Sequence, residues 1–238
     1  MSSLSRYQSV PNSDKSITDF INDNSKNRKI NSSGGSIRDS SSKIAIYADS
    51  HGKNIVKLVA EGVGGRVFGM IKPGAAFNEV TECCISDSKK MTDHDLVVLI
   101  GGTNDMDNFN SKNVISTLKR RLLNLTNVNV IIMNIPRRYD LPVSSNVHYQ
   151  ISMTNIEIAR VCKRFNNVKL LDVNSLGRRF HTRHGLHFNL LGKRFIADFI
   201  VRSSMKIDSG LRLPVEVDSD CAIETFPSLP EQDLIILN

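Results

Sequence analysis

The feature that most constrains the fold is an alternation of short apolar runs with longer segments of helical period, from Lys43 to about Met205. Five apolar runs of strand length occur, at residues 44–48, 66–71, 95–100, 128–135 and 168–173. Helical segments are expected after the first run, where Ile55, Leu58 and Val59 share one face, and over about 77–85, 111–125, 147–165 and 190–205. Strands that alternate with helices in this way predict an α/β fold, a three-layer α/β/α sandwich around a five-stranded parallel sheet.

The connections in such a sheet determine where the functional residues are expected. Right-handed crossovers place the carboxyl ends of all parallel strands at one edge of the sheet, where α/β proteins bind their ligands. We call the five loops that follow the strands the rim. Polar residues in these loops are therefore the candidates for chemistry.

Composition divides the chain into one domain and two tails. The 238 residues, 40% hydrophobic and 23% charged, can hold one domain of ordinary size with a buried core. Residues 1–42 are dominated by Ser, Asn, Asp and Lys, which predicts a disordered N-terminal tail. Residues 43–205 form the predicted domain, and residues 206–238 form an acidic, mostly unstructured C-terminal tail.

Several functional classes find no support in the sequence. It contains no apolar run of about 18 residues and no secretory signal, which argues against a membrane-spanning helix and an exported protein. The four cysteines have no metal-ligand spacing, so no metal site and no cofactor is predicted, and they resemble the reduced thiols of an intracellular, cytoplasmic protein. The absence of Trp argues against a module that stacks nucleic-acid bases on aromatic platforms.

The net charge of +7 is distributed unevenly. Residues 1–42 hold six basic and four acidic residues, and residues 205–238 hold two basic and seven acidic ones. The 23 basic and 13 acidic residues that remain leave residues 43–204 with a charge of +10. This division predicts attraction to a polyanion, or an acidic tail that screens the basic domain in the same molecule; a solvated basic surface without a ligand is the alternative.

Ser50 is the candidate nucleophile. It follows the first apolar run directly, within the segment Ala48-Asp49-Ser50-His51-Gly52, and a helical pattern begins soon after it. A serine at this place can expose its hydroxyl beside backbone N–H groups that stabilise an oxyanion. On this stretch alone, a helix N-cap is the favoured interpretation of Ser50.

Three further rim residues complete a set suited to acyl transfer. Gly74 offers a backbone N–H, Asn104 offers a side-chain amide, and His187 offers a general base. The N–H of Ser50, the N–H of Gly74 and the amide of Asn104 form the expected oxyanion hole. Taken singly, each residue has a simpler explanation: a tight turn for Gly74, a helix cap for Asn104 and a surface position for His187.

In the order of these residues the chain resembles the SGNH (GDSL-like) hydrolase superfamily, whose four blocks contribute Ser, Gly, Asn and His. Residues 48–50 are similar to the Gly-Asp-Ser block, and Gly74 falls where the second block has its glycine. Residues 102–105, Gly-Thr-Asn-Asp, fit the Gly-x-Asn-Asp block, and residues 185–189 are similar to the histidine block. The resemblance spans roughly residues 43–204.

This resemblance implies a flavodoxin-like SGNH hydrolase fold and a serine esterase that forms an acyl-enzyme on Ser50 and acts on a small ester or a lipid-like substrate. The segment after the fourth strand and the run Arg-His-Gly-Leu-His before the last helix are, more narrowly, similar to the SGNH-like domains of insect and retrotransposon-derived proteins. Some SGNH-fold domains lack the catalytic residues and bind RNA, which keeps a non-enzymatic function open.

Two residues depart from the family pattern. The superfamily's last block has Asp three residues before the catalytic His, and this chain has His184 there. Three outcomes are open: His184 orients His187 as a third catalytic residue, Asp140 or Asp172 from another rim loop replaces the missing carboxylate, or the site is inactive. Ala48 stands where the first block has glycine, and its methyl group is expected to strain or narrow the pocket.

Basic residues gather in the same loops. The candidates for binding an anionic substrate, a lipid headgroup or RNA are Arg137, Arg138, Arg178, Arg179 and Arg183, with Lys72 and Lys193 nearby in the rim. Loops at strand ends are often polar in any case, so a basic surface without a ligand stays the alternative.

Overall fold

The structure is a computed structural model that describes residues 42–64 and 66–208. The predictions of a disordered N-terminal tail and an unstructured C-terminal tail fall on residues 1–41 and 209–238, outside the described residues. Within the described part of the chain, no helix is long and apolar enough to cross a membrane.

Five parallel strands form one sheet, as predicted. The strands are β1 (Lys43–Ala48), β2 (Arg66–Ile71), β3 (Leu96–Ile100), β4 (Asn129–Met133) and β5 (Val168–Leu171). Their order across the sheet is β2-β1-β3-β4-β5, which is the flavodoxin-like order. The predicted strands at 128–135 and 168–173 are longer than β4 and β5, mainly because residues 134–135 and 172–173 belong to rim loops.

The register of the central strands brings three rim loops to one level. Ala48, the last residue of β1, pairs with Ile71 of β2 on one side and with Ile100 of β3 on the other. These are the last residues of their strands as well. The loops that carry Ser50, Gly74 and Asn104 therefore leave the sheet side by side.

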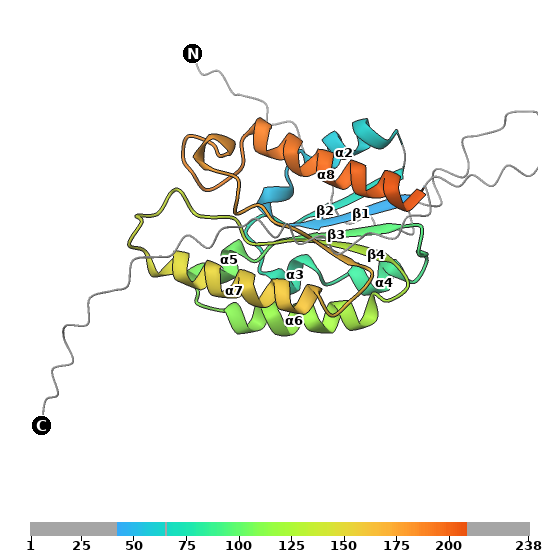
Figure 1. Cartoon of the computed structure of the whole chain (residues 1–238), viewed down its shortest axis with the longest axis horizontal. Coiled ribbons are helices and arrows are strands. Elements are labelled where there is room, and N and C mark those ends of the chain that lie inside the picture. The colour runs from blue at the N-terminus through green and yellow to red at the C-terminus, as the bar shows by residue number, and fades with distance from the viewer. Residues whose placement is uncertain (1–41, 65, 209–238) are drawn as a thin grey trace, which may run out of the picture.

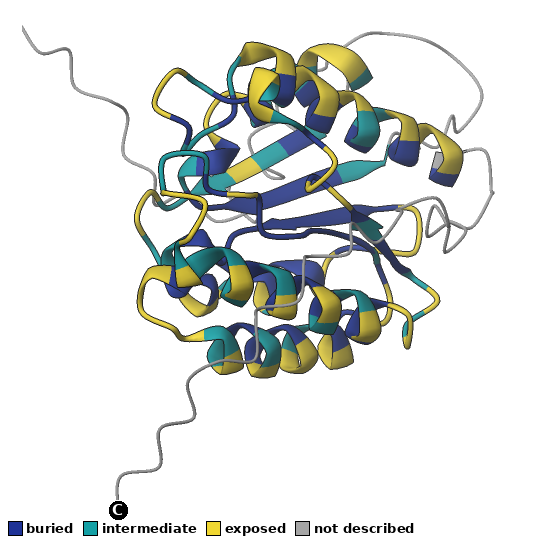
Figure 2. Cartoon of the chain, turned by 60° about the vertical axis from the view of Figure 1, so that its left-hand side comes forward, coloured by how far each residue is buried: buried dark blue, intermediate teal, exposed yellow. Residues whose placement is uncertain are grey.

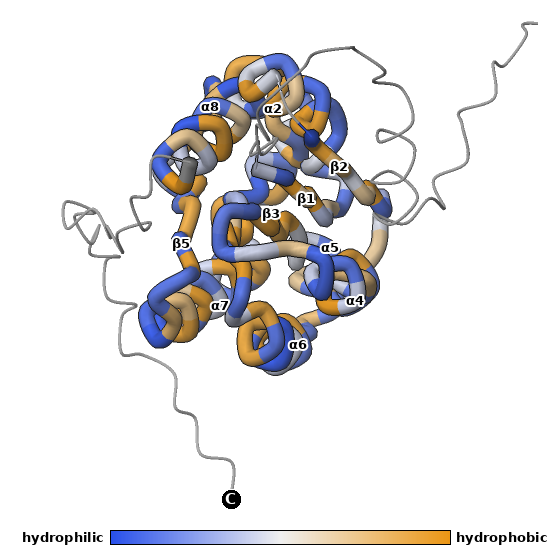
Figure 3. Tube along the Cα trace, turned by 90° about the vertical axis from the view of Figure 1, so that its right-hand side faces the viewer, coloured by the Kyte–Doolittle hydropathy of each residue, from blue (hydrophilic) through white to orange (hydrophobic). Residues whose placement is uncertain are grey.

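Helices cover both faces of the sheet, which gives the three predicted layers (Figure 1). The described helices are η1 (Ser50–Gly52), α2 (Ile55–Val63), α3 (Phe77–Val80), α4 (Cys84–Ser88), α5 (Thr103–Asp107), α6 (Ser111–Asn124), α7 (Asn146–Cys162), η2 (Arg178–Phe180) and α8 (Leu190–Asp208). Helices α2 and α8 pack on one face, and α3 to α7 lie on the other (Figures 1 and 3).

One predicted helix is interrupted. The helix expected over 77–85 is two short helices, α3 and α4, separated at Thr81. The Thr81 hydroxyl donates a hydrogen bond to the carbonyl of Phe77 and accepts one from Nε of Arg121. A threonine side chain that bonds to nearby backbone in this way competes with the helical pattern.

The core consists of two apolar clusters, one on each face of the sheet. Alternate residues of each strand enter different clusters: on β1, Ala45 and Tyr47 face α3 to α7, whereas Ile44, Ile46 and Ala48 face α2 and α8. Burial on both faces explains why β1, β3 and β4 read as nearly continuous apolar runs rather than as alternating patterns. Figure 2 shows the buried sheet between helices whose outer sides are exposed, and Figure 3 shows the apolar strands from the end of the molecule.

Candidate active site

Ser50 begins the turn that follows β1. The N–H of Asp49 still bonds to the carbonyl of Ile100 on β3, at 3.0 Å, and the 3₁₀ turn η1 starts at the next residue. Asp49 caps this turn, because its carboxylate accepts the N–H of His51 at 2.8 Å. The N-cap role considered for Ser50 is therefore wrong, and the Ser50 hydroxyl is left for another partner.

Ala48 does not narrow the pocket as expected. Its side chain is fully buried, in the cluster on the α2 and α8 face. A Cβ atom placed on Gly52 would lie 2.2 Å from the Cβ of Ala48 and 2.8 Å from a methyl carbon of Ile71. The methyl group of Ala48 therefore packs beneath the turn, and the missing side chain of Gly52 provides the space for it.

The partner of Ser50 is His187. Nε2 of His187 lies 3.0 Å from Oγ of Ser50, although the two residues are 137 positions apart in the sequence. Both side chains are half-buried, so the pair is shielded from bulk water and still accessible from the rim. A ring nitrogen at this distance can accept the hydroxyl proton when the nucleophile attacks.

Contacts of the last rim loop hold His187 in place. Phe188 is fully buried and pairs with His181 in an isolated antiparallel bridge, and the N–H of Thr182 bonds to the carbonyl of His187 at 2.8 Å. Gly185 has a φ of +96°, and its carbonyl accepts the N–H of Tyr139 at 3.1 Å. A Cβ on Gly185 would lie 2.6 Å from the carbonyl carbon of Tyr139, so only glycine allows this approach between the two rim loops.

Gly74 and Asn104 lie on opposite sides of Ser50, because β1 lies between β2 and β3. The amide Nδ2 of Asn104 donates to the carbonyl of Ala75 at 2.9 Å, which joins the two flanking loops in front of β1. Gly74 has a φ of +77°, a backbone conformation that favours glycine. A Cβ atom placed on it would have no neighbour within 4 Å, so the surroundings leave room for a side chain. Among the described residues, none accepts a hydrogen bond from the backbone N–H of Ser50 or of Gly74.

The charges around His187 favour its neutral form. Burial lowers the pKa of His187 below 6.5, Lys193 and His184 lower it further, and Asp140 acts in the opposite direction. A neutral imidazole can act as a base at neutral pH. The same balance leaves the imidazolium that forms during attack weakly stabilised.

No described residue forms a hydrogen bond with Nδ1 of His187. His184 is exposed and forms no hydrogen bond within the described ranges.

The Asp172 carboxylate accepts from Asn134 and from the N–H of Asn174, so it serves the ends of β4 and β5. Asp140 is paired with Arg138, which lowers the pKa of that carboxyl. Asp140 therefore acts on His187 only through its charge, and neither His184 nor Asp172 takes the place of the family's aspartate in this structure.

Two of the five arginines expected to bind an anion are occupied by the protein itself. Arg138 is buried, and its guanidinium forms ion pairs of 2.8 Å with Asp107 and Asp140. The guanidinium of Arg178 donates to the carbonyls of Thr182 and Arg183 and so supports the last rim loop. The side chains of the other three, which are Arg137, Arg179 and Arg183, are exposed.

Comparisons with known proteins bear on the fold. No family model and no curated protein matches the sequence. A lipase/acylhydrolase from Enterococcus faecalis has a similar structure, with a TM-score of 0.53 at 18% identity, over 74% of this chain and 98% of that one. A putative acylhydrolase from Bacteroides fragilis gives a TM-score of 0.56 at 14% identity, over 80% and 96% of the two chains. A carbohydrate esterase of family 3 from Talaromyces cellulolyticus gives 0.55 at 16% identity, over 71% and 99%.

The chain has the SGNH hydrolase fold. At these identities the likeness concerns the fold alone, and the narrower resemblance to insect and retrotransposon-derived domains stays a prediction. Within this fold, Ser50, Gly74, Asn104 and His187 each stand at the rim, in the order in which the four sequence blocks occur.

Two histidines near the pair Ser50 and His187 were not identified from the sequence. His51 is 1% exposed, and its ring centre lies 5.2 Å from that of His187 and 5.5 Å from that of Phe188. Neither ring nitrogen of His51 has a described partner, and burial lowers its pKa to about 3. His181 contacts the ring of Phe188 from another side, with ring centres 4.7 Å apart. The ring of His51 therefore lies beside His187, and His181 supports Phe188. The sequence signal for His51 was that it follows Ser50 directly.

Two acidic residues of the sequence blocks are also buried beneath the site. Asp49 is inaccessible, and burial raises its pKa from 3.8 to about 7. Burial also raises the pKa of Asp105, whose carboxylate accepts the N–H of Phe77 at 2.8 Å. One oxygen of each has no partner among the described residues. Asp49 connects the end of β1 to η1, Asp105 connects α5 to the start of α3, and neither forms a described hydrogen bond with His187. In the same described part of the chain, no three His, Cys, Asp or Glu side chains are grouped to hold a metal ion.

Proposed function

We propose that this chain is a serine esterase in which Ser50 and His187 form the catalytic pair. Nε2 of His187 takes the proton from Oγ of Ser50 while Oγ attacks the ester carbonyl carbon. The same proton then passes to the leaving alcohol, and an acyl-enzyme remains on Ser50. Water, deprotonated by His187, attacks the acyl group and releases the carboxylic acid, which restores the serine hydroxyl.

Three donors support the developing oxyanion in this proposal. The N–H groups of Ser50 and Gly74 are unengaged by described residues, and Asn104 has a second amide hydrogen beside the one bonded to Ala75. Removing one oxyanion-hole donor in a serine protease costs about 10² to 10³ in kcat, which indicates how much such donors contribute.

The distance of 3.0 Å between Ser50 and His187 carries the proposal. Because no described group orients Nδ1 of His187, we expect slow turnover compared with an enzyme that has a carboxylate at this place. Serine proteases set the scale, since amidating the aspartate of their catalytic triad lowers kcat by about 10⁴. Substrates with a good leaving group, such as aryl esters, should therefore reveal the activity most readily.

The rim also suggests the class of substrate. The exposed side chains of Leu190 and Leu191 stand at the start of α8, directly after the histidine block. The exposed arginines 137, 179 and 183 belong to adjacent rim loops. Apolar and cationic side chains together favour an ester with an acyl chain and an anionic group, such as a small amphiphile or a lipid.

Hydrolysis of short-chain aryl esters tests the proposal. Ser50→Ala should lower kcat/KM by at least about 10³-fold, because the nucleophile is lost while the fold is kept. A fluorophosphonate should also label wild-type Ser50, as mass spectrometry of the peptide would show. Ser144→Ala, which changes an exposed serine in a different rim loop, is the control and should leave both readouts unchanged. Equal activity in Ser50→Ala and wild type would refute the assignment.

A further inference from the structure

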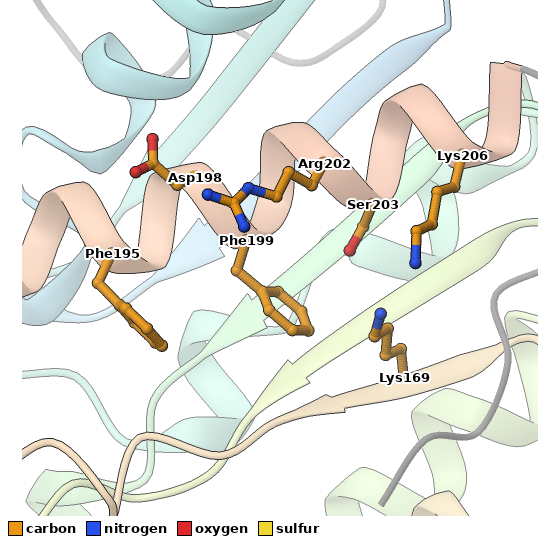
Figure 4. Close-up of a pocket in the computed structure, with 7 residues that line it drawn as sticks. All are labelled: Lys169, Phe195, Asp198, Phe199, Arg202, Ser203 and Lys206. Atoms are coloured by element: carbon orange, nitrogen blue, oxygen red, sulfur yellow. The ribbon is translucent and has the colours of Figure 1, made fainter. Parts of the chain in front are cut away.

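A groove on the outside of α8 lies apart from the Ser50 site. It runs between α8 and β5, the edge strand of the sheet, and encloses a cavity of about 250 Å³. The side chains that line it are Lys169, Phe195, Asp198, Phe199, Arg202, Ser203 and Lys206 (Figure 4). We call this the α8–β5 groove, and none of its lining residues belongs to the candidate active site.

The groove combines cationic and aromatic groups. Three of its side chains are basic and only Asp198 is acidic. Figure 4 shows the rings of Phe195 and Phe199 directed from α8 toward β5, with the amino groups of Lys169 and Lys206 facing one another beneath the helix. The amino group of Lys169 also lies 4.8 Å from the centre of the Phe199 ring. Such a surface fits a peptide that offers carboxylates to the cations and apolar side chains to the rings.

Two groove residues are available at the surface. Phe195 is 41% exposed, so a ligand can reach its ring from solvent. Arg202 is exposed and forms no ion pair with any residue of the described ranges. A ligand can therefore reach both the aromatic and the cationic part of the groove.

The chain itself contains a segment of the matching chemistry. Residues 209–238 hold six acidic residues and one basic residue, a net charge of −5, and include the apolar run Leu234–Leu237. The segment follows α8 directly, and Lys206 is two residues before the last residue of that helix. The groove side of α8 from Phe195 to Lys206 is roughly 17 Å long, a distance that five or six extended residues can cover.

We propose that the α8–β5 groove binds the acidic segment 209–238 of the same chain. The carboxylates between Glu216 and Asp220 follow α8 closely enough to reach Arg202 and Lys206, which are both exposed. A short tether gives the segment an effective concentration in the millimolar range, so even a weak site is occupied. This proposal concerns a different face of the molecule from the esterase site and does not depend on it.

Cys221 allows the contact to be tested in the full chain. It lies within the acidic segment, whereas Cys84 and Cys162 are buried and Cys83 is half-buried. In a Cys83→Ser background, a photoreactive benzophenone maleimide on Cys221 should cross-link mainly to peptides that contain Lys169 or residues 195–206. Peptide mass spectrometry identifies these sites.

Charge reversal shows whether the groove causes the contact. Arg202→Glu with Lys206→Glu should lower the cross-link yield at least about fivefold, and 0.5 M NaCl should lower it in the wild-type groove by screening the charges. Lys112→Glu with Lys119→Glu is the matched control, because both lysines are exposed on α6, in the opposite helical layer. The control has the same change of net charge and should keep the wild-type yield. Melting temperatures verify that all variants fold.

Three results would overturn the proposal. Cross-links spread over other surfaces, or unaffected by reversal at Arg202 and Lys206, would mean that the groove does not hold the segment. Cross-links between isotopically light and heavy chains in a mixed sample would make the occupant a second copy. An unchanged cross-link pattern in the reversed variant, together with a loss of RNA binding, would assign the groove to a nucleic acid instead.

Discussion

At the residue scale, the pKa of His187 sets the expected pH dependence of ester hydrolysis. Its pKa lies below 6.5, so in the proposed esterase the base becomes neutral, and hydrolysis is expected to begin, as the pH rises through a midpoint below 6.5. The rise in activity is thus expected in the acidic range, not at neutrality. His184→Asp should move this midpoint upward, because an adjacent carboxylate favours the imidazolium. It should also raise kcat by at least about tenfold and by at most roughly 10⁴-fold, the effect of the triad aspartate in serine proteases.

The pH profile of kcat/KM for an aryl ester measures both effects. His94→Asp is the matched control, since His94 is exposed in the turn before β3, at the edge of the sheet opposite the rim. This control should keep the wild-type midpoint. A lower kcat in His184→Asp with an unmoved midpoint would show that a carboxylate at this position does not act on His187.

Asp49 leads to a prediction about stability. Its pKa is about 7 in the folded protein against an ordinary value of 3.8, so the folded state keeps a proton that the unfolded state loses above pH 4. The contribution of Asp49 to the free energy of unfolding is therefore greatest below pH 4 and falls as the pH rises toward 7. Asp49→Asn, which is neutral at every pH, should be more stable than wild type at pH 8, by at most roughly 4 kcal/mol.

Urea unfolding at pH 4 and pH 8 tests this expectation. The two proteins should differ less at pH 4, where wild-type Asp49 is protonated. Asp93→Asn, at an exposed carboxyl, should show no such dependence on pH. A wild-type protein that gains stability over Asp49→Asn between pH 4 and pH 8 would contradict the burial argument.

At the scale of the elements, the close approach of two rim loops positions His187. Gly185→Ala forces a side chain into a left-handed conformation and against the backbone of Tyr139. We expect a loss of about 1–3 kcal/mol in stability and of roughly 10² in kcat, because a displacement of about 1 Å at a catalytic group has that effect. Gly177 lies in the same connection, with a φ of −63° and open space around it. Gly177→Ala is therefore the control and should leave activity unchanged.

Steady-state kinetics and thermal melts separate these two outcomes. Equal kcat in Gly185→Ala and Gly177→Ala would mean that the contact between the rim loops does not position His187.

The elements themselves were predictable to different degrees. The five strands and the long helices followed from local periodicity, because the apolar runs mark the strands, of which β1, β3 and β4 are buried on both faces. The break at Thr81 did not, and the Thr81 hydroxyl there accepts a hydrogen bond from Arg121, forty residues away, which no local pattern shows. The short helix α5 and the turn η1 were also missed, because so few residues carry no measurable helical period.

At the scale of the whole molecule, the charge of +10 on residues 43–204 leads to the last prediction. A basic domain of this kind can bind a polyanion, and three exposed rim arginines offer the contacts. We expect affinity for single-stranded RNA that falls steeply with salt and shows little dependence on base sequence. Replacing Arg137, Arg179 and Arg183 with Gln should reduce the slope of log K against log salt by about 2, at roughly 0.7 for each phosphate contact.

Fluorescence anisotropy over a salt series measures this slope. Arg66, Arg164 and Arg194 lie outside the proposed contacts, and the same replacement there should change the slope by less. An equal effect of the two sets would indicate attraction by total charge rather than by the rim. RNA binding without any ester hydrolysis would favour the non-enzymatic function.

The sequence by itself determined the layers, the strands and the place of Ser50, Gly74, Asn104 and His187 at strand ends. Apolar periodicity is local, and the handedness of the crossovers then sets which edge the loops share. Only the tertiary structure decided what each side chain contacts. Arg138 reads as a free cation in the sequence but is buried between Asp107 and Asp140, and His51 reads as a loop residue but lies with its ring beside His187. These contacts join loops far apart in the chain, and they depend on how the loops pack on one another, which no local pattern encodes.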